Sequence, residues 1–275
     1  LTFEDSNKKY KLKFNSIIQK QTNHLINEIR KTKHIQNKII GCAAIILVGL
    51  CYRDEKNYLN FGLENLKKIS KMSLDNSGFP KSRNASQLIF YLKYFILIRE
   101  WFKESQNQIP DHIDETIFYL GQSYAFIWQN VNLDLFFNGN INSDNVEFDN
   151  YLKRLGYKFK NDNHDHGGYV ILNDKNTVLA MDVGSTPNSE FTENYQSGAL
   201  SFEIIRKGKK LISNCGYYDA SNKKLNKISK SSASQNTLTI DDHSSNKMNK
   251  LSLIDRGLKI IKRDSVFEKN YWKII

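Results

Sequence analysis

Residues 169–183 read YVILNDKNTVLAMDV, and this stretch decides the class of fold. Two runs rich in Val, Ile and Leu flank the polar residues 173–176, which is the pattern of a β-hairpin. A second pair of runs, 199–205 and 210–214, flanks Lys207-Gly208-Lys209 in the same way. The sequence therefore predicts antiparallel strands joined by short turns in this part of the chain.

The segments on either side extend this pattern. Further short strands are predicted at 133–137, at 237–240 and within 251–275, with a polar exposed loop at 221–234. Toward the N-terminus the apolar residues instead recur at helical spacing, which predicts helices over 55–72, 86–104 and 111–128, the last capped by Asp111. Helices followed by strands predict an α+β chain with a boundary near residue 131.

An apolar run at 39–52 is about fourteen residues long, with Lys38 before it and Arg53 after it. A helix needs about 20 apolar residues to cross a bilayer. The run therefore predicts a buried helix and no membrane span.

The charge suggests an anionic partner but does not identify one. Lys and Arg outnumber Asp and Glu by 40 to 29, which gives a net charge of +11 and an isoelectric point near 9.3. Counted by halves the excess is spread, and most of the basic residues are Lys, whereas site-specific carboxylate binding favours Arg. A solvated Lys-rich surface is the simpler interpretation, with an anion-binding surface as the alternative. No zinc finger, helix-turn-helix or aromatic-basic repeat accompanies the charge, so nucleic-acid binding is not expected.

Three polar segments next to apolar runs or tight turns are the candidate sites. They are residues 75–84, 194–203 and 234–242. A fourth polar segment contains His164-Asp165-His166, which we interpret as a turn before a strand. A metal site there would need ligands from elsewhere in the chain.

In their order along the chain, the three segments resemble the heparinase II/III-like family of polysaccharide lyases. The resemblance also uses residues 133–139, 169–184 and 211–216, and it spans roughly residues 35 to 250. It implies an incomplete (α/α) toroid followed by an antiparallel β-sandwich. Residues 1–131 would then be the C-terminal part of the toroid and 132–275 the N-terminal part of the sandwich, so a piece of a longer protein is expected.

The resemblance implies β-elimination on uronic-acid polysaccharides. Such an enzyme neutralises the carboxylate, removes the C5 proton with a base and protonates the leaving oxygen with an acid. By resemblance, Arg83 and Asn84 would contact the carboxylate and Tyr195 would transfer a proton. A tyrosine base needs a lowered pKa, which a nearby Arg83 could supply. Asn84 could instead only cap a helix, and Tyr195 could only pack.

The other site residues implied by the resemblance are substrate-binding amides. They are Asn194, Gln196, Asn214 and Gln235. Tyr91, Tyr124 and His243 remain further candidates for the acid and the base.

The sequence departs from the family where some members bind zinc. The positions that resemble the zinc ligands are Gln196, Asn214 and Gln235, and amides are poor zinc ligands beside imidazole and carboxylate. We therefore expect no structural zinc and no other cofactor, with an amide hydrogen-bond network in place of the metal.

Two functions remain open at this point. One is a lyase that acts on an acidic polysaccharide. The other is a non-catalytic glycan-binding or envelope-assembly protein on the same fold, which the missing His residues favour. By resemblance, either protein is expected in the periplasm or the cell envelope.

Overall fold

The computed structural model describes residues 8–52, 56–129, 131, 133–139, 145–219, 221–249, 253–268 and 272–274. By its contacts the chain divides into two compact units. The helical unit comprises residues 1–74 and 90–119, and the sheet unit comprises residues 75–89 and 120–275. Residues 75–89 thus group with the strands, although they lie among the helices in the sequence.

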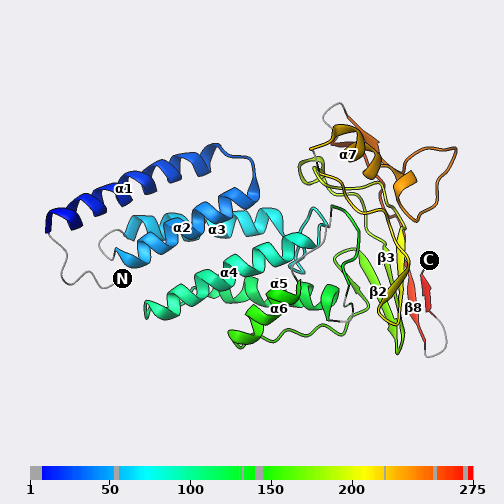
Figure 1. The fold of residues 1–275 in the computed structure, drawn as a ribbon, viewed down its shortest axis with the longest axis horizontal. Helices are drawn as coiled ribbons and strands as arrows, with labels where there is room; N and C mark the ends of the chain where they lie inside the picture. The colour runs from blue at the N-terminus through cyan, green and yellow to red at the C-terminus, as the bar shows by residue number, and fades with distance from the viewer. Residues whose placement is uncertain are drawn as a thin grey trace. The chain divides into compact units, whose positions relative to one another are not determined.

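Three consecutive helices form the first part of the helical unit (Figure 1). They are α1 (Lys8–Lys31), α2 (Ile35–Cys51) and α3 (Lys56–Ser73), and α2 packs against both of the others. The helix α2 is apolar on most of its surface and is buried over much of its length, as the sequence predicted. Among the described helices, none is both long and apolar enough to cross a membrane.

Glycines allow α2 and α3 to pack closely. A Cβ atom at Gly49 would lie 2.5 Å from the backbone nitrogen of Leu59, and one at Gly62 would lie 2.6 Å from Cγ1 of Ile46. The unit is completed by the parts of α4 (Ser86–Glu104) and α5 (Asp111–Trp128) that fall within residues 90–119. These helices and α3 confirm the three helices predicted at 86–104, 111–128 and 55–72.

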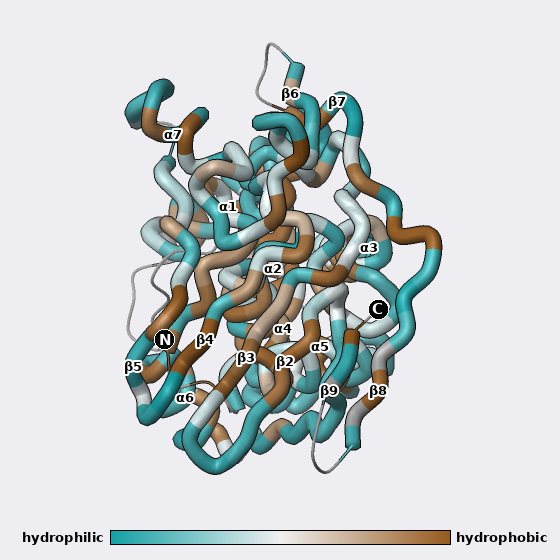
Figure 2. The backbone as a smooth tube through the Cα atoms, turned by 90° about the vertical axis from the view of Figure 1, so that its right-hand side faces the viewer, coloured by the Kyte–Doolittle hydropathy of each residue, from teal (hydrophilic) through white to brown (hydrophobic). Residues whose placement is uncertain are grey.

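A five-stranded antiparallel sheet forms the centre of the sheet unit. Its strands follow in sequence order: β1 (Asp165–His166), β2 (Tyr169–Asp174), β3 (Thr177–Asp182), β4 (Phe202–Arg206) and β5 (Lys209–Ile212). The first four residues of β2 are buried, and Val170, Leu172 and Val183 form an apolar cluster. Figure 2 shows the apolar colour along β2 and β3 and the hydrophilic turn that joins them.

Both predicted hairpins are confirmed, with tighter turns than expected. Pairing of β2 with β3 continues as far as Asp174 and Thr177, which leaves a two-residue turn. The turn between β4 and β5 is Lys207-Gly208, with φ angles of 49° and 72°. Positive φ at both positions is the requirement of a type I′ hairpin turn.

The sheet unit contains further short elements outside the main sheet. They are α6 (Asn145–Arg154), the 3₁₀ turns Ser189–Phe191 and Ser232–Ser234, α7 (Lys223–Ser229), and two small antiparallel pairs, β6 (Lys247–Met248) with β7 (Ile254–Arg256) and β8 (Ser265–Phe267) with β9 (Trp272–Ile274). The last three strands confirm the strands predicted within 251–275.

Two strand predictions and one loop prediction are wrong. Residues 133–137 are not a strand, and the Phe136 backbone nitrogen donates to the Glu203 carboxylate instead of to a neighbouring strand. Residues 237–240 contain only an isolated bridge between Ile240 and His243. The segment predicted as a loop at 221–234 contains α7, which begins at Lys223. The preceding Asn222 caps this helix, because its side chain accepts hydrogen bonds from two backbone nitrogens.

The α+β class is therefore established, with seven helices and a five-stranded antiparallel sheet in the described part of the chain. A toroid, a sandwich and a domain boundary at residue 131 stay predictions.

Candidate functional site

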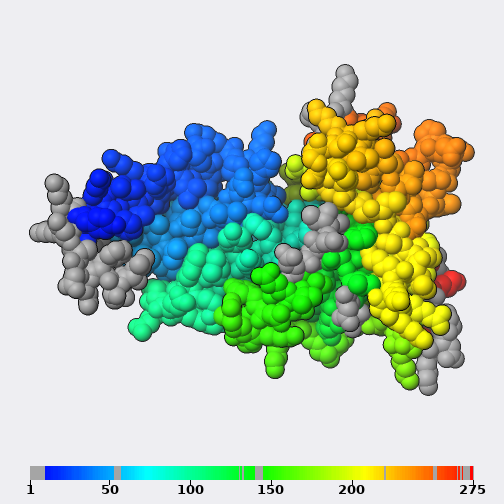
Figure 3. Space-filling model, viewed as in Figure 1, coloured from blue at the N-terminus to red at the C-terminus, as the bar shows by residue number. Residues whose placement is uncertain are grey.

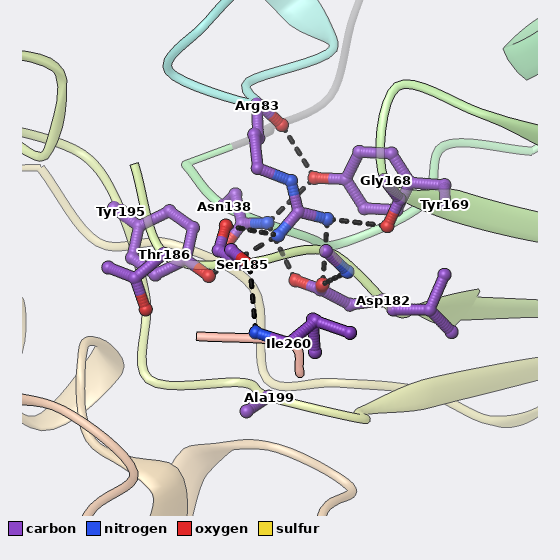
Figure 4. Close-up of polar contacts among 12 residues, drawn as sticks. Arg83, Asn138, Gly168, Tyr169, Asp182, Ser185, Thr186, Tyr195, Ala199 and Ile260 are labelled. Carbon is purple, nitrogen blue, oxygen red and sulfur yellow. Dashed lines mark hydrogen bonds and ion pairs between the residues drawn. The ribbon is translucent and has the colours of Figure 1, made fainter. Parts of the chain in front are cut away.

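Arg83 is the centre of a buried polar cluster in the sheet unit (Figure 4). It lies in the loop between α3 and α4 and adopts φ = 61°, which is uncommon for a residue with a Cβ atom. Its side chain is 7% exposed. Atom Nη2 donates to Oδ1 of Asp182 at 2.7 Å and to the carbonyl of Gly168 at 2.6 Å. The loop is therefore joined to the sheet by a buried ion pair.

Asp182 ends β3 and is 1% exposed. Its second oxygen accepts from Nδ2 of Asn138 at 2.8 Å. Burial by itself lowers the pKa of the Arg83 guanidinium, but the nearby Asp182 carboxylate and its hydrogen bond raise this pKa above its ordinary value. Both oxygens of Asp182 are thus hydrogen-bonded, as a buried ion pair requires, whereas Nε of Arg83 is buried without a hydrogen-bond partner among the described residues.

Tyr169 supports the guanidinium through its ring and its hydroxyl. The ring centroid lies 4.7 Å from Cζ of Arg83, and the hydroxyl donates to the Arg83 carbonyl while accepting from Asn138 at 2.7 Å. Burial raises the pKa of Tyr169, so its phenol is neutral at physiological pH.

Two glycines make room for the same guanidinium. A Cβ atom at Gly168 would lie 2.8 Å from Nε of Arg83, and one at Gly184 would lie 2.5 Å from Cζ. Any side chain at either position would displace Arg83.

Tyr195 meets Arg83, as the sequence argument for a tyrosine base required. The distance from Tyr195 Oη to Arg83 Nη1 is 3.4 Å. Burial and the Asp182 charge nevertheless outweigh Arg83 and raise the pKa of Tyr195 to about 12. Tyr195 therefore keeps its proton at neutral pH, and in this arrangement it is suited to donate a proton but not to remove one.

Asn84 has two sets of contacts. Its Oδ1 accepts from the nitrogen and the hydroxyl of Ser86 at the start of α4, which is the capping interaction considered from the sequence. Its Nδ2 makes a long hydrogen bond of 3.3 Å to the carbonyl of Gly139. The donor side of this amide is therefore the side that a carboxylate could use.

The amide Gln196 is buried and fully engaged. Its Oε1 accepts from the nitrogen of Gly139 at 3.1 Å, and its Nε2 donates to the carbonyls of Gly216 and Ser229 at 2.8 and 2.6 Å. Gln235 donates to the same Ser229 carbonyl at 3.1 Å. These two amides thus meet at one acceptor.

The third amide, Asn214, is linked to the same region through the neighbour of Gln235. Its Oδ1 accepts from the nitrogen of Asn236 at 2.8 Å. The oxygens of Gln196 and Asn214 are therefore already occupied by backbone N–H groups, so this donor set does not fit a zinc ion. The absence of structural zinc stays a prediction.

Asn194, like Gln235, is half-buried. Its Oδ1 accepts from the Tyr217 hydroxyl at 2.9 Å, and its Cβ lies against Gly139, next to the Asn84 amide. Asn194 is therefore more exposed than Asn84 and Tyr195, which are both buried.

The two histidines of His164-Asp165-His166 do not converge with Asp165 on one point. Nε2 of His166 lies 2.7 Å from the Ser123 hydroxyl, whereas Asp165 pairs with Arg263. Within the described residues, no group of three His, Cys, Asp or Glu side chains could hold a metal ion.

Sequence reasoning missed Asn138, Tyr169 and Asp182, which hold Arg83 in place. Asp182 had a usable signal, because it is an acidic residue at the end of a strand that is otherwise apolar. Such a residue, when buried, needs a cationic or hydrogen-bonding partner.

The sequence itself matches a known family in its C-terminal part. Residues 160–275 match the sequence profile of the family described as "Heparinase II/III-like, C-terminal". This match confirms, for the C-terminal part of the chain, the resemblance stated from the sequence. No curated protein sequence matches the chain.

Solved structures share the fold over a longer span. The heparan sulfate lyase HepC from Pedobacter heparinus superposes with a TM-score of 0.62 and 16% identity, covering 78% of this chain and 39% of that one. A heparinase III structure superposes with a TM-score of 0.67 and 15% identity, covering 88% of this chain and 45% of that one. The chain thus spans less than half the length of these proteins.

Proposed function

We propose that the chain is part of a polysaccharide lyase-like protein that cleaves an acidic, uronic-acid glycan by β-elimination. The observation that carries the proposal is the match of residues 160–275 to the heparinase II/III-like family. The likeness of the fold to a heparan sulfate lyase and to a heparinase III supports it. A polymer of this kind lies outside the cytoplasm, so we propose the periplasm or the cell envelope as the place of action.

The proposed roles follow from the contacts. Asn84 would offer Nδ2 to the uronate carboxylate, a base outside the Arg83 cluster would take the C5 proton, and Tyr195 would protonate the departing glycosidic oxygen. Arg83 is a positioning residue in this scheme, because its guanidinium is held by Asp182 and itself holds Tyr195. Asn194, Gln196, Asn214 and Gln235 would shape the surface that meets the sugar, with Asn194 in direct contact.

The test is the ultraviolet absorbance of the unsaturated uronate that β-elimination creates. The purified protein is incubated with a panel of uronic-acid polymers, and new absorbance with at least one of them is expected. Tyr195→Phe should lower the rate by about 10²–10⁴-fold, the contribution of a positioned proton donor. The exposed Tyr218→Phe is the matched control and should leave the rate unchanged. Absence of absorbance with every polymer would contradict the proposal.

A second candidate is a glycan-binding protein without catalysis. The observation that favours it is that Gln196 is buried and hydrogen-bonded through both its oxygen and its nitrogen to other groups of the chain. Arg83 and Asn214 are also buried and hydrogen-bonded within the chain, although Nε of Arg83 and Nδ2 of Asn214 have no hydrogen-bond partner among the described residues. This function predicts that a uronic-acid polymer is retained in affinity electrophoresis without being cleaved, and that Tyr195→Phe does not change the retention.

A further inference from the structure

A pocket of about 290 Å³ lies in the helical unit, whereas the polar cluster around Arg83 belongs to the sheet unit. Its walls come from α1, α2 and α3, and its lining residues are Ile29, Arg30, Lys38, Asn65, Lys68, Ile69 and Met72. Three of these seven side chains are cationic and none is a carboxylate. The volume is at the lower end of the range of small-molecule sites, which suits one sugar unit rather than a long chain segment.

The cations of the pocket are free to bind an anion. Within the described residues, none of Arg30, Lys38 and Lys68 forms an ion pair. The acidic residue nearest to Arg30 on α1 is Glu28, whose carboxylate is bound by Lys31 at 2.9 Å. Arg30 is instead held over the ring of Phe61 at 5.5 Å, which fixes its guanidinium at the wall of the pocket.

The surrounding charge favours the same ligand. The helices α1–α3 carry twelve basic residues and only two acidic ones, Glu28 and Glu64. The net charge of the whole chain is +11, so these three helices account for most of it. Figure 3 shows the surface of this N-terminal part of the chain, where blue marks the position in the sequence and not the charge.

The uncharged lining residues of the pocket suit a sugar better than an inorganic anion. Ile29 and Ile69 are buried and form an apolar floor, with Met72 exposed at the rim. Asn65 is half-buried and uses one amide hydrogen on the carbonyl of Phe61, which leaves its oxygen and a second hydrogen available. A sugar ring presents an apolar face and hydroxyl groups, whereas inorganic sulfate or phosphate presents only oxygens.

We propose that this pocket binds one acidic sugar unit through its carboxylate or sulfate group. Arg30, Lys38 and Lys68 would hold the charged group, and Ile29 and Ile69 would contact the ring. The proposal rests on the proposed function only for the source of the sugar, since the pocket lies in the other unit from Tyr195 and Asn84. It makes the helical unit a secondary contact for the same acidic glycan.

The test is isothermal titration of the protein with a sulfated uronic-acid disaccharide, inorganic sulfate and a DNA duplex. The pocket variant R30Q/K38Q/K68Q removes three charges, and K13Q/K20Q/K67Q removes three exposed charges from α1 and α3 outside the pocket. Loss of even one charge-assisted hydrogen bond lowers affinity by more than about tenfold. We expect at least this loss for the disaccharide with the pocket variant, and much less with the control.

Three outcomes would overturn the proposal. Equal losses in the two variants would mean diffuse attraction to the helices. Inorganic sulfate that binds as tightly as the disaccharide would mean a site for a bare oxyanion. A DNA duplex that binds as tightly as the disaccharide would mean a nucleic-acid surface. If the protein cleaves no polymer but loses affinity for the disaccharide only in the pocket variant, the proposed pocket is supported and the proposed lyase activity is contradicted.

Discussion

The ion pair between Arg83 and Asp182 joins residues 75–89 to the strands of the sheet unit. Removing one partner of a buried pair leaves an uncompensated charge, which typically costs about 3–5 kcal/mol. We therefore expect Asp182→Asn to lower the free energy of unfolding by about this amount, as measured by urea denaturation. The exposed pair Lys31–Glu28 provides the control, because solvent screens it and Glu28→Gln should change stability far less. A cost for Asp182→Asn as small as that of Glu28→Gln would contradict this role.

His166 gives the sheet unit a pH-dependent stability. Burial lowers the pKa of His166, against the opposing charges of Asp75 and Asp165, so the unfolded chain takes up the proton more readily than the folded one. The stability contribution is fully present above the unfolded pKa of about 6.5 and decreases as the pH falls below it toward the folded pKa. His166→Gln should therefore flatten the decline in urea stability between about pH 7 and pH 5. The exposed His243→Gln is the control, and an equally steep decline in His166→Gln would refute the assignment.

The Arg83 cluster was only partly predictable from the sequence. The segment 75–84 could be singled out because polar residues and a glycine interrupt two helices, and Arg83 and Tyr195 do meet. The pKa of Tyr195 could not be predicted, because it depends on how deeply the phenol is buried and on Asp182, a residue distant in sequence.

At the level of elements, two glycines next to the ends of strands pack against Arg83: Gly168 precedes β2 and Gly184 follows β3. Gly168 has φ = 81° and packs on the guanidinium, whereas Gly156 has φ = 78°, and a Cβ atom there would have nothing within 4 Å. Alanine at either position would therefore carry the same backbone strain, and only the contact with Arg83 would differ. We expect Gly156→Ala to cost about 1 kcal/mol and Gly168→Ala about 1–3 kcal/mol more, as thermal or urea unfolding would measure. Equal costs would mean that Arg83 moves aside freely.

Close packing of α2 on α3 gives a second prediction at this level. A methyl group at Gly49 would meet the backbone of Leu59, which cannot move as a flexible side chain can. Gly49→Ala should therefore destabilise the helical unit by about 1–3 kcal/mol, although alanine is the better helix former. A stabilised variant in helix-monitored urea unfolding would show that the two helices separate without cost.

The elements themselves were predicted unevenly. The amphipathic helices α3, α4 and α5 and the two hairpins follow from periodicity and turn residues, because local spacing determines them. The strands expected at 133–137 and 237–240 have the composition of strands but no partner in a ladder. Phe136 is bonded to Glu203, and Asp241 and Asp242 turn the chain with positive φ. Strand pairing depends on distant residues, which a local pattern does not contain.

For the whole molecule, the sequence predicted an α+β chain with helices before strands, and this order is confirmed. It did not predict that residues 75–89 group with the sheet unit. That association depends on the contacts of Arg83 with Gly168 and Asp182, which lie about a hundred residues further along the chain.

The most direct test of the proposed lyase is the fate of water in the reaction. The protein is incubated with a uronic-acid polymer in ¹⁸O-labelled water, and the new chain ends are analysed by mass spectrometry. β-Elimination predicts unsaturated ends one water lighter than hydrolytic products, formed without ¹⁸O incorporation. Saturated non-reducing ends together with ¹⁸O at the new reducing ends would show hydrolysis, because water then attacks the anomeric carbon. Unchanged polymer would show no cleavage. Either result would contradict the proposed function.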